Sequence, residues 1–169
     1  SDANVAVGAN AGYGITTGGS NIAIGASSMY VHTTGEKNTC LGYGTMMDTN
    51  AGSNSLGSDE NVFIGYASGG GTWADVASEK NVAIGNGTLT AALNGANSNI
   101  AIGYDSLNDL TAGDFNVSIG SYAGDAITDT DNCVLIGGYT GSGLNSSDAD
   151  GTVAIGHQAG QMLTSGQAN

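Results

Sequence analysis

Proline is absent from this sequence of 169 residues, and basic residues are almost absent. Two lysines, Lys37 and Lys80, stand against 15 acidic residues, and the formal net charge is −13. No nucleic-acid partner is expected, because the chain has almost nothing with which to neutralise a phosphate backbone. The sequence also lacks any apolar run near the roughly 18 residues that cross a bilayer, so we expect no membrane insertion of this segment.

Glycine, in contrast, is abundant, with 30 residues. It does not recur at every third position, which together with the missing proline excludes a collagen triple helix. The chain is 40% hydrophobic and only 10% charged, a composition too apolar for the usual disordered class. The glycine content therefore calls for a periodic explanation.

A pentapeptide of the pattern Asn-Val/Ile-Ala-Ile/Val-Gly recurs along the whole chain. Copies that keep the asparagine begin at Asn4, Asn21, Asn38, Asn61, Asn81, Asn99 and Asn116, and two degenerate copies begin at Cys133 and Thr152. The motif glycines are 17–23 residues apart. A short β-branched run closed by glycine predicts one strand per unit. We therefore expect a single repeat domain over residues 1–169, an all-β parallel β-solenoid of about nine coils.

Each predicted strand has a bulky face and a small face. Val, Ile, Thr or Leu flank a middle position that is often alanine, and side chains alternate between the two faces of a strand. We expect the bulky pair to fill the inside of the coil and the small middle residue to point outward, where it permits close packing of a second layer. The motif asparagines should stack in a column, since amides both donate and accept.

Histidine and cysteine are too scattered to suggest a site. His32 and His157 fall in different units without a neighbouring ligand set, so a zinc site is not expected and both are interpreted as polar loop residues. Cys40 and Cys133 lie five units apart, which is too far for a disulfide, and we expect both to be buried as small apolar residues.

The repeat resembles the YadA-like head repeats of trimeric autotransporter adhesins and related repeats of phage tail fibres, from Asn4 to about Gly166. The resemblance implies a left-handed β-roll in which three chains lie side by side, in an elongated adhesin or receptor-binding fibre. The 17-residue spacing is closer to the phage versions than to the shorter adhesin repeats. For that reason the collagen binding of the adhesins is not carried over.

The small middle position and the resemblance together predict a homotrimer. If the bulky pairs fill each roll, the small residues form a smooth outward stripe suited to close contact with a neighbouring chain. We therefore predict a trimer interface at the five middle alanines, Ala6, Ala23, Ala83, Ala101 and Ala154.

Receptor contacts are expected where the chain departs from the repeat, because insertions in a solenoid become surface loops. The candidates are Trp73, Asp75, Tyr66, Asn54 and Asp59. An aromatic ring beside a carboxylate suits a sugar, so the partner would be a host cell-surface glycan or protein. Trp73 can equally be an apolar plug against the coil below. Tyr43, Tyr66 and Tyr104 each follow a motif glycine and form either an exposed aromatic column or ordinary corner packing.

No cofactor is expected, with calcium as the one alternative. Alternate acidic side chains can converge on a cation, which makes Asp129, Asp131, Asp148 and Asp150 candidates. Neither stretch matches an EF-hand loop, and the favoured interpretation is that these acids are solvated and keep a rod soluble. We expect no enzyme, because no nucleophile and base grouping and no phosphate-binding loop is present.

These observations predict a structural and adhesive segment of a longer homotrimeric fibre, on a virion tail or on the extracellular surface of a bacterium. Its role would be cell adhesion or host receptor binding. The alternative is a monomeric β-solenoid that binds a repetitive ligand such as a polysaccharide or ice. A glycosidase or lyase built on a solenoid is the third and least favoured function, because it needs two carboxylates placed across a groove, which the sequence does not show.

Overall fold

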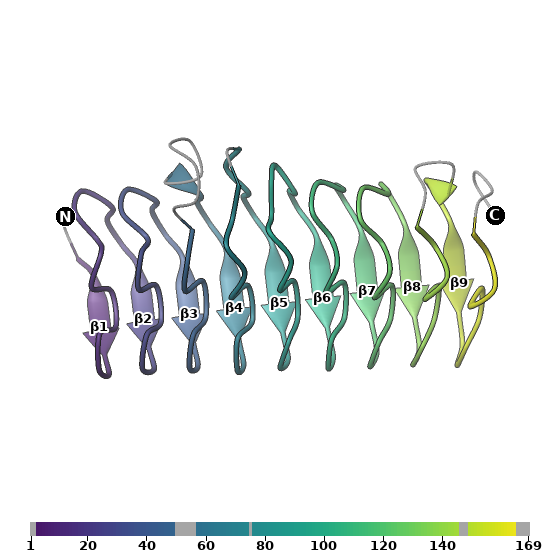
Figure 1. Ribbon diagram of the computed structural model, residues 1–169, viewed down its shortest axis with the longest axis horizontal. Helices are drawn as coiled ribbons and strands as arrows, with labels where there is room; N and C mark the ends of the chain where they lie inside the picture. The colour runs from purple at the N-terminus through teal and green to yellow at the C-terminus, as the bar shows by residue number, and fades with distance from the viewer. Residues whose placement is uncertain (1–2, 50–56, 75, 146–148, 165–169) are drawn as a thin grey trace.

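A computed structural model describes residues 3–49, 57–74, 76–145 and 149–164. These residues form a β-solenoid, which confirms the expected fold class (Figure 1). Nine parallel three-residue strands pair in chain order in one sheet, and the termini lie at opposite ends of the rod. The strands are β1 (Val5–Val7), β2 (Ile22–Ile24), β3 (Thr39–Leu41), β4 (Val62–Ile64), β5 (Val82–Ile84), β6 (Ile100–Ile102), β7 (Val117–Ile119), β8 (Val134–Ile136) and β9 (Val153–Ile155).

The repeat sets the register, because equivalent motif residues pair on successive coils. Ala83 lies opposite Ala101, for example, and the longer unit between β3 and β4 pairs in the same register as its neighbours. The motif glycine closes each strand with φ between 127° and 143°. A Cβ added at Gly42 would collide with the carbonyl oxygen of Gly65 on the next coil. Glycine is therefore required at this corner by both its φ angle and its close backbone approach.

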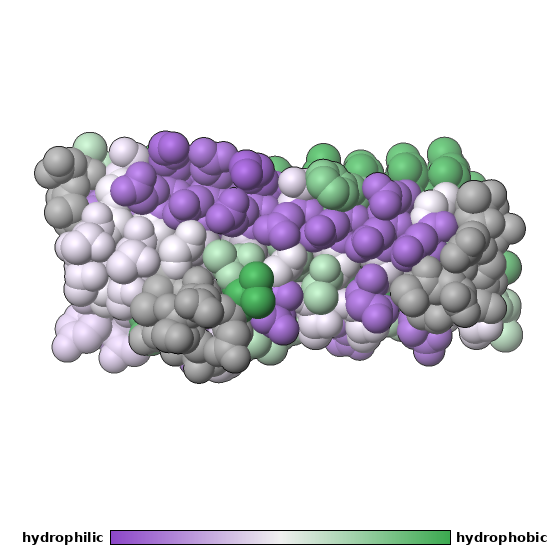
Figure 2. Space-filling model, turned by 90° about the horizontal axis from the view of Figure 1, so that it is seen from above, coloured by the Kyte–Doolittle hydropathy of each residue, from purple (hydrophilic) through white to green (hydrophobic). Residues whose placement is uncertain are grey.

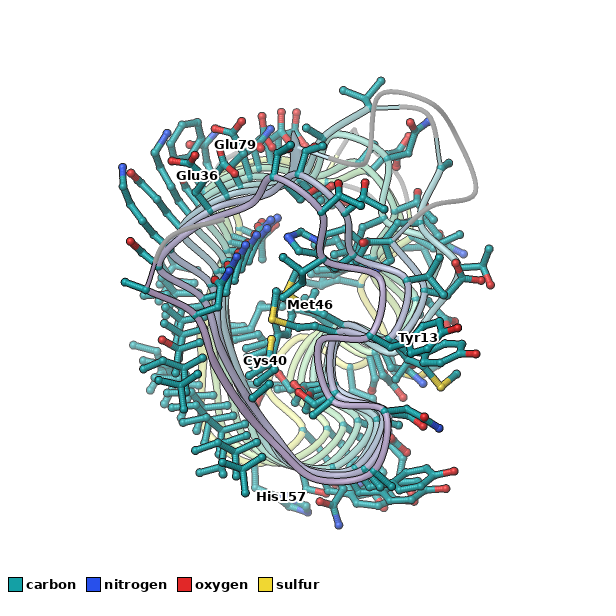
Figure 3. The ribbon with its side chains drawn as sticks, turned by 90° about the vertical axis from the view of Figure 1, so that its left-hand side faces the viewer. Tyr13, Glu36, Cys40, Met46, Glu79 and His157 are labelled. Atoms are coloured by element: carbon teal, nitrogen blue, oxygen red, sulfur yellow. The ribbon has the colours of Figure 1, made fainter. Side chains whose placement is uncertain are left out.

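The middle residue of each strand points into the coil, and the prediction that it faces outward is wrong. Side chains at this position are fully buried in the interior strands, at Ala23, Cys40, Phe63, Ala83, Ala101, Ser118 and Leu135, while Ala154 is 7% exposed and Ala6, in the first coil, is exposed. The flanking Val, Ile and Leu residues face outward instead. Figure 3 shows Cys40 pointing into the interior, towards Met46 from the opposite wall.

The opposite wall explains why the small residue lies inside. In four coils the fourth residue after the motif glycine is long and the middle residue is small, as in the pairs Ala83 with Leu89 and Ala101 with Leu107, all fully buried. Where the middle residue is large, the wall has a glycine. A Cβ on Gly69 would lie only 2.7 Å from the ring of Phe63. In these coils the two positions compensate in volume, as a close-packed interior requires, whereas Ala6, Ser118 and Ala154 are small and also face a glycine.

The asparagine column forms as predicted. The Oδ1 atom of Asn38 accepts the backbone N–H of Asn61 at 2.9 Å and a side-chain N–H of Asn61 at 3.1 Å. The Nδ2 atom of each asparagine also donates to a backbone carbonyl of a neighbouring coil, as Asn61 does to Ser78. The column ends where Cys133 donates its N–H to Asn116. These bonds satisfy backbone and amide groups that are fully buried from Asn21 onward.

His32 is part of the interior, so its interpretation as a polar loop residue is wrong. The side chain is fully buried, with Nδ1 2.9 Å from Thr49 Oγ1 and Nε2 3.2 Å from Asn38 Nδ2. Burial lowers the pKa of His32 to about 4, so the ring is neutral at pH 7. Cys40 and Cys133 are free and buried, as expected, and burial raises the pKa of the Cys40 thiol.

Candidate functional site

The outer face of the sheet is an exposed row of aliphatic side chains. We call it the outer aliphatic face. It consists of the first and third residues of each strand: Val5, Val7, Ile22, Ile24, Thr39, Leu41, Val62, Ile64, Val82, Ile84, Ile100, Ile102, Val117, Ile119, Val134, Ile136, Val153 and Ile155. Every member except Thr39 is Val, Ile or Leu. Those classed as exposed keep 36–66% of their surface accessible, and the others are half-buried by their neighbours above and below.

This face is flat, continuous and large. Nine strands at about 4.8 Å spacing and two side-chain rows about 10 Å across give a projected area on the order of 400 Å². Continuous apolar patches of a few hundred Å² on soluble proteins mark interaction surfaces. In Figure 2, hydrophobic side chains are visible at the upper edge of the right-hand half of the rod, beside a hydrophilic band.

A ladder of acidic side chains contributes to that hydrophilic border. It occupies the position two residues before the motif head, at Glu36, Asp59, Glu79, Asp114, Asp131 and Asp150, with Asn97 in place of an acid on the coil between Glu79 and Asp114. Along it, a side-chain oxygen accepts the backbone N–H of the residue on the preceding coil, at 2.7 Å from Asp114 to Asp131 and 2.8 Å from Asp131 to Asp150. Lys37 and Glu60, beside it, form an exposed ion pair of 3.3 Å.

Of the calcium candidates, the structure describes Asp129, Asp131 and Asp150, and these three form no cluster. Asp131 and Asp150 belong to the acidic ladder, whereas exposed Asp129 accepts a bond from the hydroxyl of Thr128 at 3.3 Å. Asp148 lies outside the described residues. Within the described ranges, no group of three or more His, Cys, Asp or Glu side chains is placed to hold a metal ion.

Of the two interpretations of Trp73, the structure agrees with an apolar side chain packed inside the coil, and the assignment to receptor contact is wrong. The side chain is fully buried, its ring meets Phe63 edge-on at 5.7 Å, and its Nε1 donates to the Gly69 carbonyl at 3.1 Å. A ligand cannot reach it without opening the coil. Asp75 and Asn54 lie outside the described residues.

Tyr66 lies on an exposed corner, in the aromatic column that the sequence suggested. It is 60% exposed and stacks on Tyr43 with ring centroids 5.4 Å apart. Further along the same corner, Tyr104, Tyr122, Tyr139 and His157 contact one another in series at 5.0–6.2 Å. Sequence reasoning missed Tyr122 and Tyr139, because each comes one residue later after its motif glycine than the others do.

The predicted receptor residues that the structure describes, Tyr66, Asp59 and the buried Trp73, do not converge on one site. Tyr66 follows β4 and Asp59 precedes it, so the two lie at opposite ends of the strand. Figure 3 shows the same separation on other coils, with Glu36 and Glu79 at one corner and His157 at another. The structure therefore offers three separate surfaces: the outer aliphatic face, the acidic ladder and the tyrosine corner.

A cavity of about 480 Å³ opens at the end of the last coil and is lined by Gln158, Gly160, Gln161, Met162 and Leu163. Among the described residues, this lining holds none that titrates near neutral pH and no strong nucleophile. Over the described part of the chain, no helix is long and apolar enough to span a membrane. No protein family, curated protein or solved structure matches the chain.

Proposed function

We propose that this chain is a structural and adhesive segment of a homotrimeric, left-handed β-roll fibre, on a phage tail or an extracellular bacterial surface. The segment holds or forms a host receptor-binding surface. The observation that carries the proposal is the outer aliphatic face, which runs unbroken from β1 to β9 and is open to solvent in the single chain.

The free energy of this face favours association. Burial of about 400 Å² of apolar surface per chain is worth on the order of 10 kcal/mol before the entropic costs of assembly. A second copy of the same chain offers a face of the same length and coil spacing, so rows of side chains can interdigitate along the whole rod. The resemblance to trimeric repeats favours three chains around one axis over a face-to-face pair.

The charges fit an arrangement in which the aliphatic face is covered. The acidic ladder borders that face, and Lys37 and Glu60 pair beside it, so the charged groups stay in water when the apolar rows meet. A net charge of −13 per chain then keeps assembled rods apart and soluble.

The proposal is tested by placing one charge on the outer aliphatic face. Ile84 is central on β5 and 37% exposed in the single chain, so Ile84→Glu is compatible with the coil but buries a carboxylate in the interface. We expect this variant to elute as a monomer with an unchanged β-sheet circular dichroism spectrum. Thr128→Glu, an exposed position on another corner, is the matched control and should elute with the wild type.

Identical elution of wild type and Ile84→Glu as assemblies would refute the interface. Elution of the wild type as a dimer would refute the threefold arrangement while keeping the aliphatic contact. A monomeric wild type would favour the alternative of a single solenoid that binds a repetitive ligand, such as a polysaccharide or ice.

A further inference from the structure

The tyrosine corner is interrupted at one coil. Tyr66, Asn86 and Tyr104 each follow a motif glycine, on the coils of β4, β5 and β6, so an exposed asparagine stands where its neighbours have an aromatic ring. Tyr66 packs one face on Tyr43, and Tyr104 meets Tyr122 at 67°. Within the described residues, neither ring has an aromatic partner on the side of Asn86. We call these three residues the Asn86 gap.

The backbone holds the three positions of the gap in register. The Gly87 N–H donates to the Tyr66 carbonyl at 3.0 Å, and the Asp105 N–H donates to the Asn86 carbonyl at 3.0 Å. The Oδ1 atom of Asn86 accepts the Tyr66 N–H at 3.0 Å, so the amide is held against the backbone and not out between the rings. Tyr66 and Tyr104 are two coils apart, about 9.6 Å at the spacing of parallel strands.

That spacing suits one inserted ring. Two surfaces that sandwich a flat ring at van der Waals contact need about 7–8 Å between them. A separation of about 9.6 Å leaves roughly 2 Å more, which is room for a puckered ring that is thicker than an aromatic one. Polar groups lie beside the space: the Nδ2 donors of Asn86, and the carboxylate of Asp105, which is so close to Gly87 that a Cβ there would collide with it. An apolar ring face with a donor and an acceptor alongside matches a hexose, whose C–H face is apolar and whose rim carries hydroxyls.

The surrounding charge selects among sugars. Asp105, Asp109 and Asp125 lie near one another on this part of the rod. The pKa of Asp125 is raised mainly by its burial, and the neighbouring charges of Asp109 and Asp105 raise it further. An anionic sugar would be repelled by this group, whereas an uncharged one would not.

We propose that the Asn86 gap binds one uncharged hexose ring of a linear glycan, stacked against Tyr66 and Tyr104 and hydrogen-bonded by Asn86 and Asp105. The inference rests on the proposed fibre, because a homotrimer would present three Asn86 gaps to one surface glycan. Simultaneous binding at several gaps strengthens the overall attachment without any new interaction at a single gap. The gap itself is complete within one chain.

The experiment is saturation-transfer difference NMR on the purified chain. The probes are cellohexaose, maltohexaose and the hexamer of N-acetylglucosamine, each at about 1 mM, with a heparin oligosaccharide as the anionic comparison. Asn86→Tyr continues the aromatic column and fills the gap. The double variant Tyr66→Ala with Tyr104→Ala removes both walls. Tyr13→Ala with Tyr30→Ala is the matched control, since these tyrosines form another exposed stacked pair, with centroids 5.3 Å apart.

At least one neutral hexamer should show transfer to wild type and to the control pair. Transfer should disappear in Asn86→Tyr, and the double variant, which loses both aromatic walls, should bind about 25-fold more weakly. Absence of transfer from all three neutral probes, undiminished binding in Asn86→Tyr, or a preference for heparin would each overturn the inference. The mass of the same samples separates the two proposals: a trimer that binds no hexamer refutes only the gap, and a monomer that binds one refutes only the fibre.

Discussion

Acid should destabilise this protein through the buried side chain of His32. The folded chain holds His32 neutral, because burial lowers its pKa to about 4 from an ordinary value of 6.5. Below pH 6.5 the unfolded chain binds a proton that the folded chain does not, so each unit of falling pH favours the unfolded state. The difference reaches about 3 kcal/mol of unfolding free energy at pH 4 and is complete only below the folded-state pKa.

The assay is urea unfolding of wild type and His32→Leu at fixed protein concentration between pH 7.5 and 4. Leucine suits the site, because Leu110 and Leu144 occupy the equivalent position of later coils. The carboxylates are common to both proteins, so the difference between the two curves isolates the histidine. We expect wild type to lose about 3 kcal/mol relative to the variant as pH falls from 6.5 to 4. Parallel curves over this range would refute the buried, neutral His32.

Two further predictions concern the interior. Ala101→Glu should destabilise the fold by several kcal/mol in chemical denaturation, because it buries an unpaired charge. A variant as stable as the wild type would contradict the inward orientation of the middle alanines. Phe63→Ala should cost about 3–5 kcal/mol, because it leaves a cavity beside Gly69 and Trp73. A loss below 1 kcal/mol would mean that the ring does not fill the coil.

The repeat, its strand positions and its asparagine column could be predicted from the sequence, because each follows from spacing alone. A motif repeated at a near-constant interval stacks in register, and a buried amide such as Asn61 then has its copies as partners. The same argument does not tell which face of a strand is inside. Alternation places Ala101 on one face of the strand and Ile100 and Ile102 on the other, but it does not tell which face belongs to the core.

The opposite wall decides that question, and its signal was present in the sequence as a size correlation. Phe63 and Leu135 each come six residues before a glycine, at Gly69 and Gly141, whereas Ala101 comes six residues before Leu107. Volumes that compensate in this way indicate residues that share one interior. The burial of His32 has the same signal, because its place in the repeat is equivalent to that of Leu110.

The surface was harder to predict, because it depends on the path of the chain between strands. Tyr122 joins the tyrosine corner although its position after the glycine is shifted by one residue. Trp73 lies in a departure from the repeat yet is buried, since its ring packs against Phe63 beneath Gly69. Departure from a repeat therefore indicates a change of chain path, and exposure has to be established separately.

The central claim is that the outer aliphatic face is the contact between three identical chains. Its most direct test is the solution mass of the purified wild-type chain by light scattering over a range of concentrations. The account predicts three times the chain mass of 16.5 kDa, constant on dilution. A mass of 16.5 kDa that persists at high concentration would contradict it.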